Sequence, residues 1–466
     1  MQLKNLTTER STQIVNMKTL YHNRKPDTTQ KIREEFTLKN STVFGGYNLL
    51  ADFIKSKRLE AILGECVDIQ KADWSTYDFP FVLRCLIDGY ILGMDRTKHF
   101  EMLEYENLIT EKLGVEKLPD YTVLNKDIKR FKDETGINGL KAAGIRLIRK
   151  RLKNKRDNII YDFDSTVEIV YGEQEGAACG YNPKKPGRLS YHPLICFEAT
   201  EDLHIDSILR RGDVHTSMGS VEFMEKVDET MSSIVKRYKK LKQKGKVLAR
   251  FDEGFDSEEN YNQAEELGWG YVGKIRCFDP LKLNIFGIKR WRKIIGGSRE
   301  IEVASITYKA GRWSKGRRVV IVRWEDDGGT QGSFFDELNY NYVAFVTNLN
   351  WAEEDIYGFY NNRGTVENRI KEAKYGFGID KIPTGEFYAN YAALQLKMIA
   401  YNLISAFQTE VMEMGSIRIS IRSIRKKFFQ IAGKLIERGR QKVLKLAEDY
   451  LYKERYLRMR KRLAEL

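Results

Sequence analysis

Short apolar runs alternate with amphipathic segments along the middle of the chain. Runs rich in β-branched and aromatic residues, such as NIIYDF at 158–163 and VLARF at 247–251, are typical of buried strands. The strands expected here span 158–163, 166–171, 191–198, 203–209, 247–251 and 271–276. The helices expected between them span 221–242 and 257–267. Strands followed by alternating helices and strands predict an α/β fold built on a mixed sheet with flanking helices.

Residues 278–342 break this alternation. They are rich in β-branched and aromatic residues and contain the glycine pairs 296–297 and 328–329, which together predict a β-rich insertion. The apolar run VAFVT at 343–347 returns to the earlier pattern, and a helix is expected to begin near Ala352.

The first 150 residues predict helices. Residues 47–63 and 122–132 have helical periodicity, and Asp120 stands where an N-cap of the second helix is expected. Short helices with basic surfaces suit a DNA-binding domain, although plain helical domains share this pattern. We therefore expect a helical N-terminal domain that binds DNA.

The end of the chain is strongly basic. Residues 416–466 contain 16 Lys plus Arg and 5 acidic residues, and their apolar positions have helical spacing, which predicts a helical region throughout. One interpretation is a docked amphipathic helix with a solvated basic face. The other is a surface that contacts a nucleic-acid backbone, and one helix can serve both purposes.

Composition narrows the class of protein. The 466 residues carry a formal net charge of +14, and 42% are hydrophobic, which is enough for folded cores and favours a polyanionic partner. The sequence contains no run of about 18 uninterrupted apolar residues, so we expect no membrane span, and the N-terminus has no secretory pattern. The five cysteines form no CxxC pair and the five histidines form no HxxxH, so we expect neither a disulfide scaffold nor a thiolate zinc site.

Carboxylates stand at the ends of two predicted strands. Asp164 follows the run NIIYDF and Asp252 follows VLARF, and strand ends are where ligands meet in open α/β sheets. A third acid, Glu367, lies in the helix after the last strand. Each one alone could be a helix cap or a surface carboxylate. Asp162 lies two residues before Asp164 and faces the same side of a strand, so it is the reserve for the first position.

The helix that carries Glu367 presents four polar residues on one face. Tyr360, Arg363, Glu367 and Lys374 are separated by 3, 4 and 7 positions. At about 100° per residue they fall within a fan of about 60°, over about 21 Å of helix. The plain alternative is a solvated stripe with an Arg363–Glu367 ion pair.

Three carboxylates brought together by two strand ends and a helix make a site of hard oxygen ligands. Such a cluster suits Mg²⁺, and two ions about 3.5–4 Å apart stabilise the attacking and leaving oxygens of a phosphoryl transfer. Arg363 and Lys374 are then expected to hold flanking phosphates, and Tyr360 to hydrogen-bond to one.

These motifs resemble the cut-and-paste DDE transposases of bacterial insertion sequences, which have a ribonuclease H-like catalytic core. The third-acid helix of that group carries Tyr-(2)-Arg-(3)-Glu-(6)-Lys, and YNNRGTVENRIKEAK matches it at every spacing. The contexts of the first two acids match as Asp164-Ser165-Thr166 and as RFDEGF around Asp252. The segments YGEQEGAACGYNPKKPGRLSYHPL and RRGDVHTS also resemble one subfamily, and the resemblance covers about residues 40–405.

The resemblance implies a chemistry and a set of partners. It implies binding of double-stranded DNA at terminal inverted repeats, nicking by water, and strand transfer to target DNA by a 3′-hydroxyl within a homodimeric synaptic complex. It also implies catalysis and metal binding by Asp164, Asp252 and Glu367, with two Mg²⁺ ions that Mn²⁺ replaces. The protein is expected in the bacterial cytoplasm, nucleoid-associated when bound to DNA, with no membrane partner.

The patterns along the chain also divide it into expected domains. They are a helical DNA-binding domain at 1–150, a catalytic core at 151–277 and 343–405, a β-rich insertion at 278–342 and a basic helical region at 406–466.

Other residues are candidates for DNA contacts. The basic loop with Lys184, Lys185 and Arg188 suits a phosphate backbone or plain solvation, and Arg211 and Lys371 are further candidates near the site. Relatives that form DNA hairpins stack an insertion Trp on a flipped base. The candidates for that role, with core packing as the alternative, are Trp291, Trp313 and Trp324. His192 and His215 lack ligand partners at metal spacing and are expected to be structural.

Two other functions compete with transposition. A catalytically silent transposase that regulates by binding DNA would retain the basic surface, although the presence of all three acids argues against decay. A glycosidase with paired carboxylates would leave the basic C-terminal region unexplained.

Overall fold

The computed structural model describes residues 32–180, 185–296, 299–325, 340–414 and 418–466. Within these ranges the side chains of 296, 299 and 364–367 are not described. The chain divides into two compact units, residues 1–40 and residues 41–466, and the architecture below is that of the second unit.

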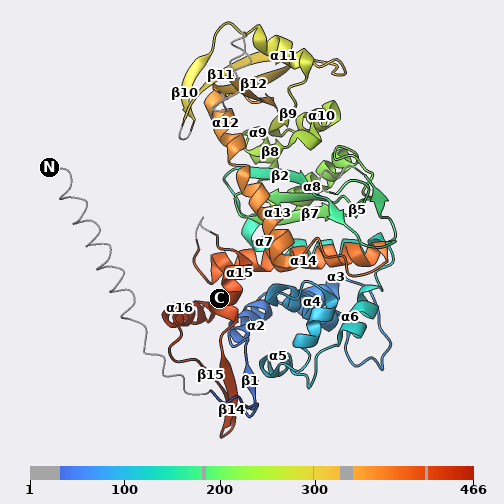
Figure 1. Ribbon diagram of the computed structural model, residues 1–466, viewed down its shortest axis with the longest axis vertical. Helices are drawn as coiled ribbons and strands as arrows, with labels where there is room; N and C mark the ends of the chain where they lie inside the picture. Colours follow the sequence, from blue (N-terminus) through green and yellow to red (C-terminus); the bar gives the residue numbers. More distant parts are fainter. Residues whose placement is uncertain (1–31, 181–184, 297–298, 326–339, 415–417) are drawn as a thin grey trace, which may run out of the picture. The chain divides into compact units, whose positions relative to one another are not determined.

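In the described residues, nine strands form one mixed sheet (Figure 1). The strand order is β10-β11-β12-β13-β9-β8-β2-β6-β7. The pairs β2–β8 and β8–β9 are parallel, and every other neighbouring pair is antiparallel. The strands are β2 (Ile159–Ser165), β6 (Leu194–Glu198), β7 (Leu203–Ile208), β8 (Val247–Phe251), β9 (Gly270–Ile275), β10 (Arg292–Gly296), β11 (Arg299–Tyr308), β12 (Arg317–Glu325) and β13 (Tyr340–Thr347). The predicted α/β fold with a mixed sheet and flanking helices is confirmed.

Helices cover both faces of this sheet. Successive side chains of a strand point to opposite faces, so each strand contributes apolar residues to the packing on both sides. On one face, Phe163 and Phe251 share a buried cluster with α8 (Ser220–Ile234), α9 (Tyr238–Gln243) and α10 (Glu258–Glu266). On the other face, Val272 and Phe345 pack against α12 (Glu353–Asn361).

Several predicted elements have different bounds in the structure. The predicted helix 221–242 is two helices, because Val235 has extended backbone angles between α8 and α9. The predicted strand 191–198 is divided at Pro193, which has no N–H to donate. Its first part joins a small sheet of β3 (Glu168–Ile169), β4 (Ala178–Cys179) and β5 (Leu189–Tyr191).

The insertion continues the main sheet. Strands β10, β11 and β12 add to it beyond β13, so the predicted β-rich character of 278–342 is confirmed for the described residues. One helix, α11 (Asp279–Phe286), opens the insertion, with Pro280 in its first turn, where a missing N–H costs nothing.

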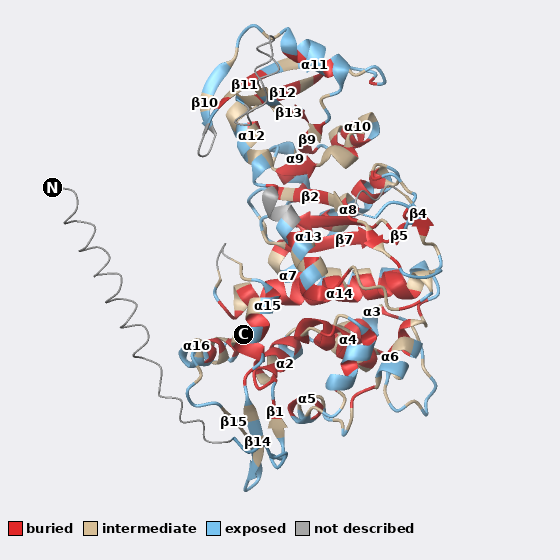
Figure 2. Ribbon diagram, viewed as in Figure 1, coloured by how far each residue is buried: buried red, intermediate tan, exposed pale blue. Residues whose placement is uncertain are grey.

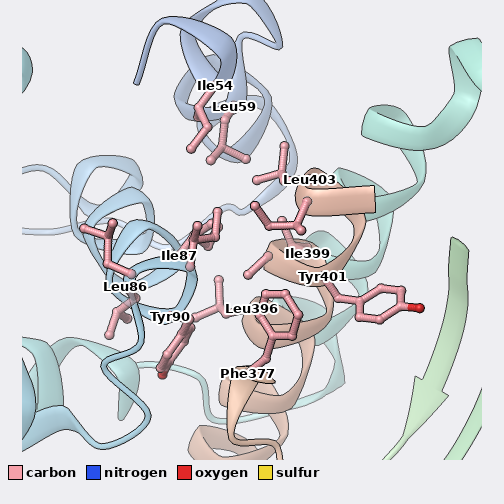
Figure 3. Close-up of a cluster of buried hydrophobic side chains, with 14 of the residues drawn as sticks. Ile54, Leu59, Leu86, Ile87, Tyr90, Phe377, Leu396, Ile399, Tyr401 and Leu403 are labelled. Carbon is pink, nitrogen blue, oxygen red and sulfur yellow. The ribbon is translucent and has the colours of Figure 1, made fainter. Parts of the chain in front are cut away.

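The helical N-terminal part packs around a long buried helix, α14 (Phe387–Glu410). Figure 3 shows Ile87 between its own helix and Leu396 and Ile399 of α14, and Ile54 on the side of its helix that faces Leu403. The helices of this part are α2 (Tyr47–Ser56), α3 (Leu59–Cys66), α4 (Phe79–Leu92), α5 (Asn107–Leu113), α6 (Tyr121–Ile128) and α7 (Glu134–Leu152). No helix in the described part of the chain has the length and apolar character needed to cross a membrane.

The structure confirms the predicted N-cap in this part and divides one of the predicted helices. Asp120 caps α6 as predicted, accepting hydrogen bonds from the backbone N–H groups of Thr122 and Val123. The predicted helix 47–63 is interrupted at Arg58, whose φ of +54° ends α2 and leads into α3.

The prediction of a helical region throughout 416–466 is wrong for residues 433–446. These residues form a hairpin of β14 (Gly433–Arg438) and β15 (Gln441–Leu446), and β14 also pairs with β1 (Ser41–Thr42). Gly439, with φ of +63°, provides the left-handed backbone that the two-residue turn requires. Figure 2 shows this hairpin mostly exposed or half-buried, and α16 (Lys453–Leu463) follows it.

Candidate active site

Two neighbouring parallel strands bring Asp164 and Asp252 to the same edge of the sheet. Strands β2 and β8 pair so that Asp162 lies beside Arg250. Asp164, near the end of β2, lies two residues after Asp162, and Asp252, directly after β8, lies two residues after Arg250. Since the carboxyl ends of parallel strands meet at one edge, the register itself places these two carboxylates together.

Arg363 joins the two acids. Its Nη2 lies 3.6 Å from Asp164 Oδ2 and 3.8 Å from Asp252 Oδ2. The same nitrogen donates a hydrogen bond of 2.9 Å to the carbonyl oxygen of Phe163, and the side chain is buried. The two carboxylates therefore face one shared cation.

Backbone hydrogen bonds set the orientation of each carboxylate. Asp164 Oδ1 accepts from the N–H of Ser165 at 2.8 Å, and Asp252 Oδ1 accepts from the N–H of Gly254 at 2.9 Å. Asp252 thereby caps the short 3₁₀ turn Glu253–Phe255. With both Oδ1 atoms held in this way, both Oδ2 atoms remain for a positively charged partner.

Burial raises the pKa of Asp164 well above its usual range, and the neighbouring charge of Asp252 raises it further, against the opposing effect of Arg363. Burial also raises the pKa of Tyr360, whose ring lies 4.6 Å from that of Phe345 between centroids. A buried carboxyl that is costly to ionise gains most from a nearby cation. This edge of the sheet is therefore electrostatically suited to a bound positive charge.

The predicted single helix with Tyr360, Arg363, Glu367 and Lys374 is interrupted. Tyr360 lies in the last turn of α12, Arg363 lies at the junction of the two helices, and Glu367 and Lys374 belong to α13 (Gly364–Phe377). Asn362 and Arg363 keep right-handed helical angles, and the N–H of Arg363 donates to the carbonyl oxygen of Tyr360, three residues back instead of four. Glu367 has a helical backbone, and its side chain lies outside the described residues.

Asp162, the reserve for the first acid, is engaged elsewhere. Its buried carboxylate accepts hydrogen bonds from Arg250 Nε at 2.6 Å, from Arg250 Nη2 at 2.7 Å and from Arg369 Nη1 at 2.8 Å. Both of its oxygens are thus bound by guanidinium groups. Of the two aspartates of β2, only Asp164 faces Asp252 through a shared partner.

The sequence analysis missed the two arginines of this network. Arg250 lies within the otherwise apolar run VLARF, and Arg369 lies two residues after Glu367. A charged residue inside a buried strand requires a partner, so Arg250 and Asp162 were a signal for a buried ion pair. Arg369 also binds Asp202 Oδ1 at 2.7 Å and the carbonyl oxygen of Ala199 at 2.9 Å.

Lys374 lies beside a second buried carboxyl that the sequence analysis also missed. Its Nζ is 3.4 Å from the carbonyl oxygen of Val167, and the next residue, Glu168, is buried. Burial raises the pKa of Glu168, opposed by the charges of Lys374 and Lys397. Lys397 donates to the carbonyl oxygens of Gly378 and Lys381, at 2.7 Å each.

The outer candidates lie at the surface. Lys185 is exposed and donates to the hydroxyl of Tyr171 at 2.8 Å, and Arg211 pairs with Asp213 at 3.1 Å. Lys371 is exposed on α13, whereas Lys184 lies outside the described residues. These residues stay predictions as DNA contacts.

The predicted tryptophans and histidines have protein partners. Trp313 is buried against Tyr261 and Tyr308, Trp324 is half-buried beside the α12 cluster, and the guanidinium of Arg323 lies 4.1 Å from the ring centroid of Trp291. His192 Nδ1 lies 2.9 Å from the carbonyl oxygen of Val214, and His215 Nδ1 lies 2.9 Å from Ser217 Oγ. A role for any Trp in base stacking stays a prediction.

The donor set suits a hard divalent cation. Asp164 and Asp252 offer carboxylate oxygens that already face one positive group, which is the ligand chemistry of Mg²⁺. Among the side chains that the structure describes, no three His, Cys, Asp or Glu residues gather into a metal site, and Glu367 lies outside that set.

A family model described as transposase DDE domain group 1 matches residues 24–466. The fold is similar to a piggyBac transposase in a cryo-EM structure of its synaptic complex with hairpin DNA, with a TM-score of 0.45 and 10% identity over 83% of this chain and 77% of that chain. No match is found among curated proteins.

Proposed function

The chain belongs to the family of transposases with a group 1 DDE domain, and from this premise we propose that it nicks DNA at element ends and transfers the strands to target DNA. The observation that carries the proposal is the arrangement of Asp164 and Asp252, whose Oδ2 atoms face the same cationic nitrogen at adjacent strand ends. This is the geometry in which two carboxylates share bound positive charge.

Glu367 is the proposed third ligand. Its helix is held against the strand of Asp164 by the Asp162–Arg369 ion pair, two residues from each acid. We propose that Asp164, Asp252 and Glu367 hold two Mg²⁺ ions, for which Mn²⁺ substitutes. Bound there, the ions supply charge stabilisation to the attacking and leaving oxygens of the phosphodiester.

The neighbouring residues bind and orient the DNA in this proposal. Arg363, whose Nη2 donates to the Phe163 carbonyl oxygen and faces both acids, is proposed to bind a phosphate of the DNA beside them. Tyr360 offers a hydroxyl whose raised pKa keeps it protonated as a hydrogen-bond donor. Lys374, on the same helix as Glu367, adds a further positive charge that can bind a DNA phosphate in this proposal.

The wider proposal follows the same family pattern. The exposed residues Lys185, Arg211 and Lys371, with Lys184, are proposed to contact the DNA backbone. The proposed catalytic core spans 151–277 and 343–405, and its meander β2-β6-β7 followed by the parallel strands β8 and β9 supports a ribonuclease H-like core. We further propose a homodimer in the synaptic complex, terminal inverted repeats and target DNA as partners, and a bacterial, nucleoid-associated location.

A metal-dependent cleavage assay tests the proposal. The substrate is duplex DNA containing the inverted repeats that flank the reading frame, incubated with the full chain and Mg²⁺. Asp164→Asn, Asp252→Asn and Glu367→Gln are each expected to lower the cleavage rate by a factor of about 10³ or more while DNA binding is retained. The matched control is Asp279→Asn, whose side chain is 94% exposed, and it should cleave like the wild type.

Two results would contradict the proposal. Cleavage at the wild-type rate by any of the three site variants would remove that residue from the site. Tight binding of the wild type without cleavage in Mg²⁺ or Mn²⁺ would favour a catalytically silent transposase that regulates by binding DNA.

A further inference from the structure

The C-terminal hairpin has one face that packs on the protein and one that does not. In an antiparallel pair, directly opposed residues share a face. The opposed residues Leu435 and Leu444 lie on the inner face, and Leu444 packs against the main helical cluster. On the same face, Lys442 Nζ binds Glu111 Oε2 of α5 at 2.6 Å. These contacts anchor the hairpin and set which face remains outside.

The outer face consists of three opposed pairs. They are Lys434 with Lys445, Ile436 with Val443, and Arg438 with Gln441. The four polar residues of these pairs are exposed, the two aliphatic ones are half-buried, and Arg440 is exposed in the turn. Figure 1 shows the hairpin extending beyond α2 and α5.

The charge on this face is unbalanced. Lys434 stands directly opposite Lys445, an arrangement of like charges that destabilises a strand pair. Within the described ranges of the chain, Lys434, Arg438, Arg440 and Lys445 form no ion pair. A face that brings cations together at a cost, and leaves them without acidic partners, is complementary to a polyanion.

The shape of the hairpin selects among polyanions. Two paired strands lie about 4.8 Å apart, and the major groove of B-DNA, about 12 Å wide, admits a two-stranded ribbon. The deep and narrow major groove of duplex RNA does not admit one. Arg and Gln, which stand opposite each other beside the turn, are side chains that bind base edges through paired hydrogen bonds.

We propose that the outer face of the β14–β15 hairpin binds double-stranded DNA, with the ribbon in the major groove. Lys434 and Lys445 lie on the phosphates that border the groove. Arg438, Arg440 and Gln441 at the turn reach toward base edges. This inference rests on the proposed function, because it assigns a DNA-contacting surface to the same protein, outside the acid site.

Binding without metal separates this inference from catalysis. The full chain with Asp164→Asn is titrated into an inverted-repeat duplex at several NaCl concentrations without divalent ions, and fluorescence anisotropy gives Kd. The hairpin variant K434Q/R438Q/R440Q/K445Q is expected to bind about tenfold or more weakly near physiological salt. The slope of log K against log [NaCl] is expected to decrease in magnitude by about 2, since the variant loses the two phosphate contacts of Lys434 and Lys445 and each removes about 0.9.

A second variant with the same loss of charge is the control. K236Q/R237Q/K239Q/K240Q alters exposed residues in and before α9, on the far side of the main sheet from α12, and should bind within about twofold of the parent. Far-UV circular dichroism and thermal unfolding check that both variants are folded. In the unmutated chain, the duplex should also protect Lys434 and Lys445 from acetylation, with Lys236 left reactive.

Each other outcome overturns the inference. Unchanged Kd and salt slope in the hairpin variant, equal losses in both variants, or stronger protection of Lys434 and Lys445 by anionic vesicles or duplex RNA would contradict it. Cleavage plays no part in this assay. A protein that binds through the hairpin but never cleaves would refute only the proposed function, and one that cleaves with unchanged hairpin-variant binding would refute only this inference.

Discussion

Arg369 of α13 and Asp162 of β2 form a buried ion pair, with Arg369 Nη1 2.8 Å from Asp162 Oδ2. Asp164 lies two residues after Asp162, and Glu367 lies two residues before Arg369. The ion pair therefore holds the strand of the first acid against the helix of the third. This structural carboxylate thus fixes the strand and the helix that carry two of the proposed catalytic acids.

Replacement of Arg369 by Ala should destabilise the fold strongly. The change leaves the buried carboxylate of Asp162 with Arg250 alone and removes one of the partners of Asp202, so the free energy of unfolding should fall by about 3 kcal/mol. Urea unfolding followed by circular dichroism measures this difference. The exposed Arg312→Ala should change stability by less than about 0.5 kcal/mol, and equal effects of both variants would refute the positioning role.

The geometry of Arg363 predicts a requirement for its guanidinium group. Arg363→Lys keeps the charge but has a shorter side chain without the planar fork of N–H donors, so it loses the remaining guanidinium donors beside the two acids. We expect the cleavage rate to fall by a factor of about 10–100, with the free energy of unfolding little changed. Single-turnover cleavage of the inverted-repeat duplex measures the effect, and wild-type rates would contradict it.

Gly439→Ala distinguishes the hairpin from the helix that the periodicity suggested. In a helix, Ala would stabilise by about 1 kcal/mol relative to Gly. At the observed φ of +63°, Ala should instead destabilise by about 1 kcal/mol. Urea unfolding gives the sign directly, and a gain in stability would show that residues 433–446 are not a hairpin.

His204 should make stability depend on pH. Burial lowers the pKa of its imidazole to about 3, aided by the charge of Lys141. Between about pH 6.5 and pH 3 the unfolded chain binds a proton that the native protein does not, so stability is lost as the pH falls through this window. From pH 7 to pH 4 the wild type should lose roughly 2–3 kcal/mol more than His204→Phe. Parallel pH profiles of the two proteins would contradict this assignment.

Local sequence patterns predicted much of the fold. The apolar runs predicted the bounds of β2, β8 and β9, most of them to within one residue. Asp120 caps its helix as expected. These elements are set by the residues within them, which is why a local pattern suffices. The strand-end positions of Asp164 and Asp252 followed from the same runs.

Other features depend on contacts that no local pattern contains. Leu435, Ile436 and Val443 fit a helical face as well as a ribbon, and the pairing of β14 with Ser41–Thr42 lies far away in the sequence. Likewise Asp162 meets Arg250 and Arg369 across 88 and 207 positions. Only folding of the whole chain shows which aspartate of β2 is bound internally and which remains at the site.

The central claim is that Asp164, Asp252 and Glu367 hold divalent ions together. Diffraction from crystals of the full chain grown with Mn²⁺, recorded at the manganese absorption edge, tests it most directly. We predict anomalous peaks about 2.2 Å from carboxylate oxygens of all three residues. Manganese bound elsewhere, or at Asp164 and Asp252 with the Glu367 carboxylate turned away from the ions, would contradict the account.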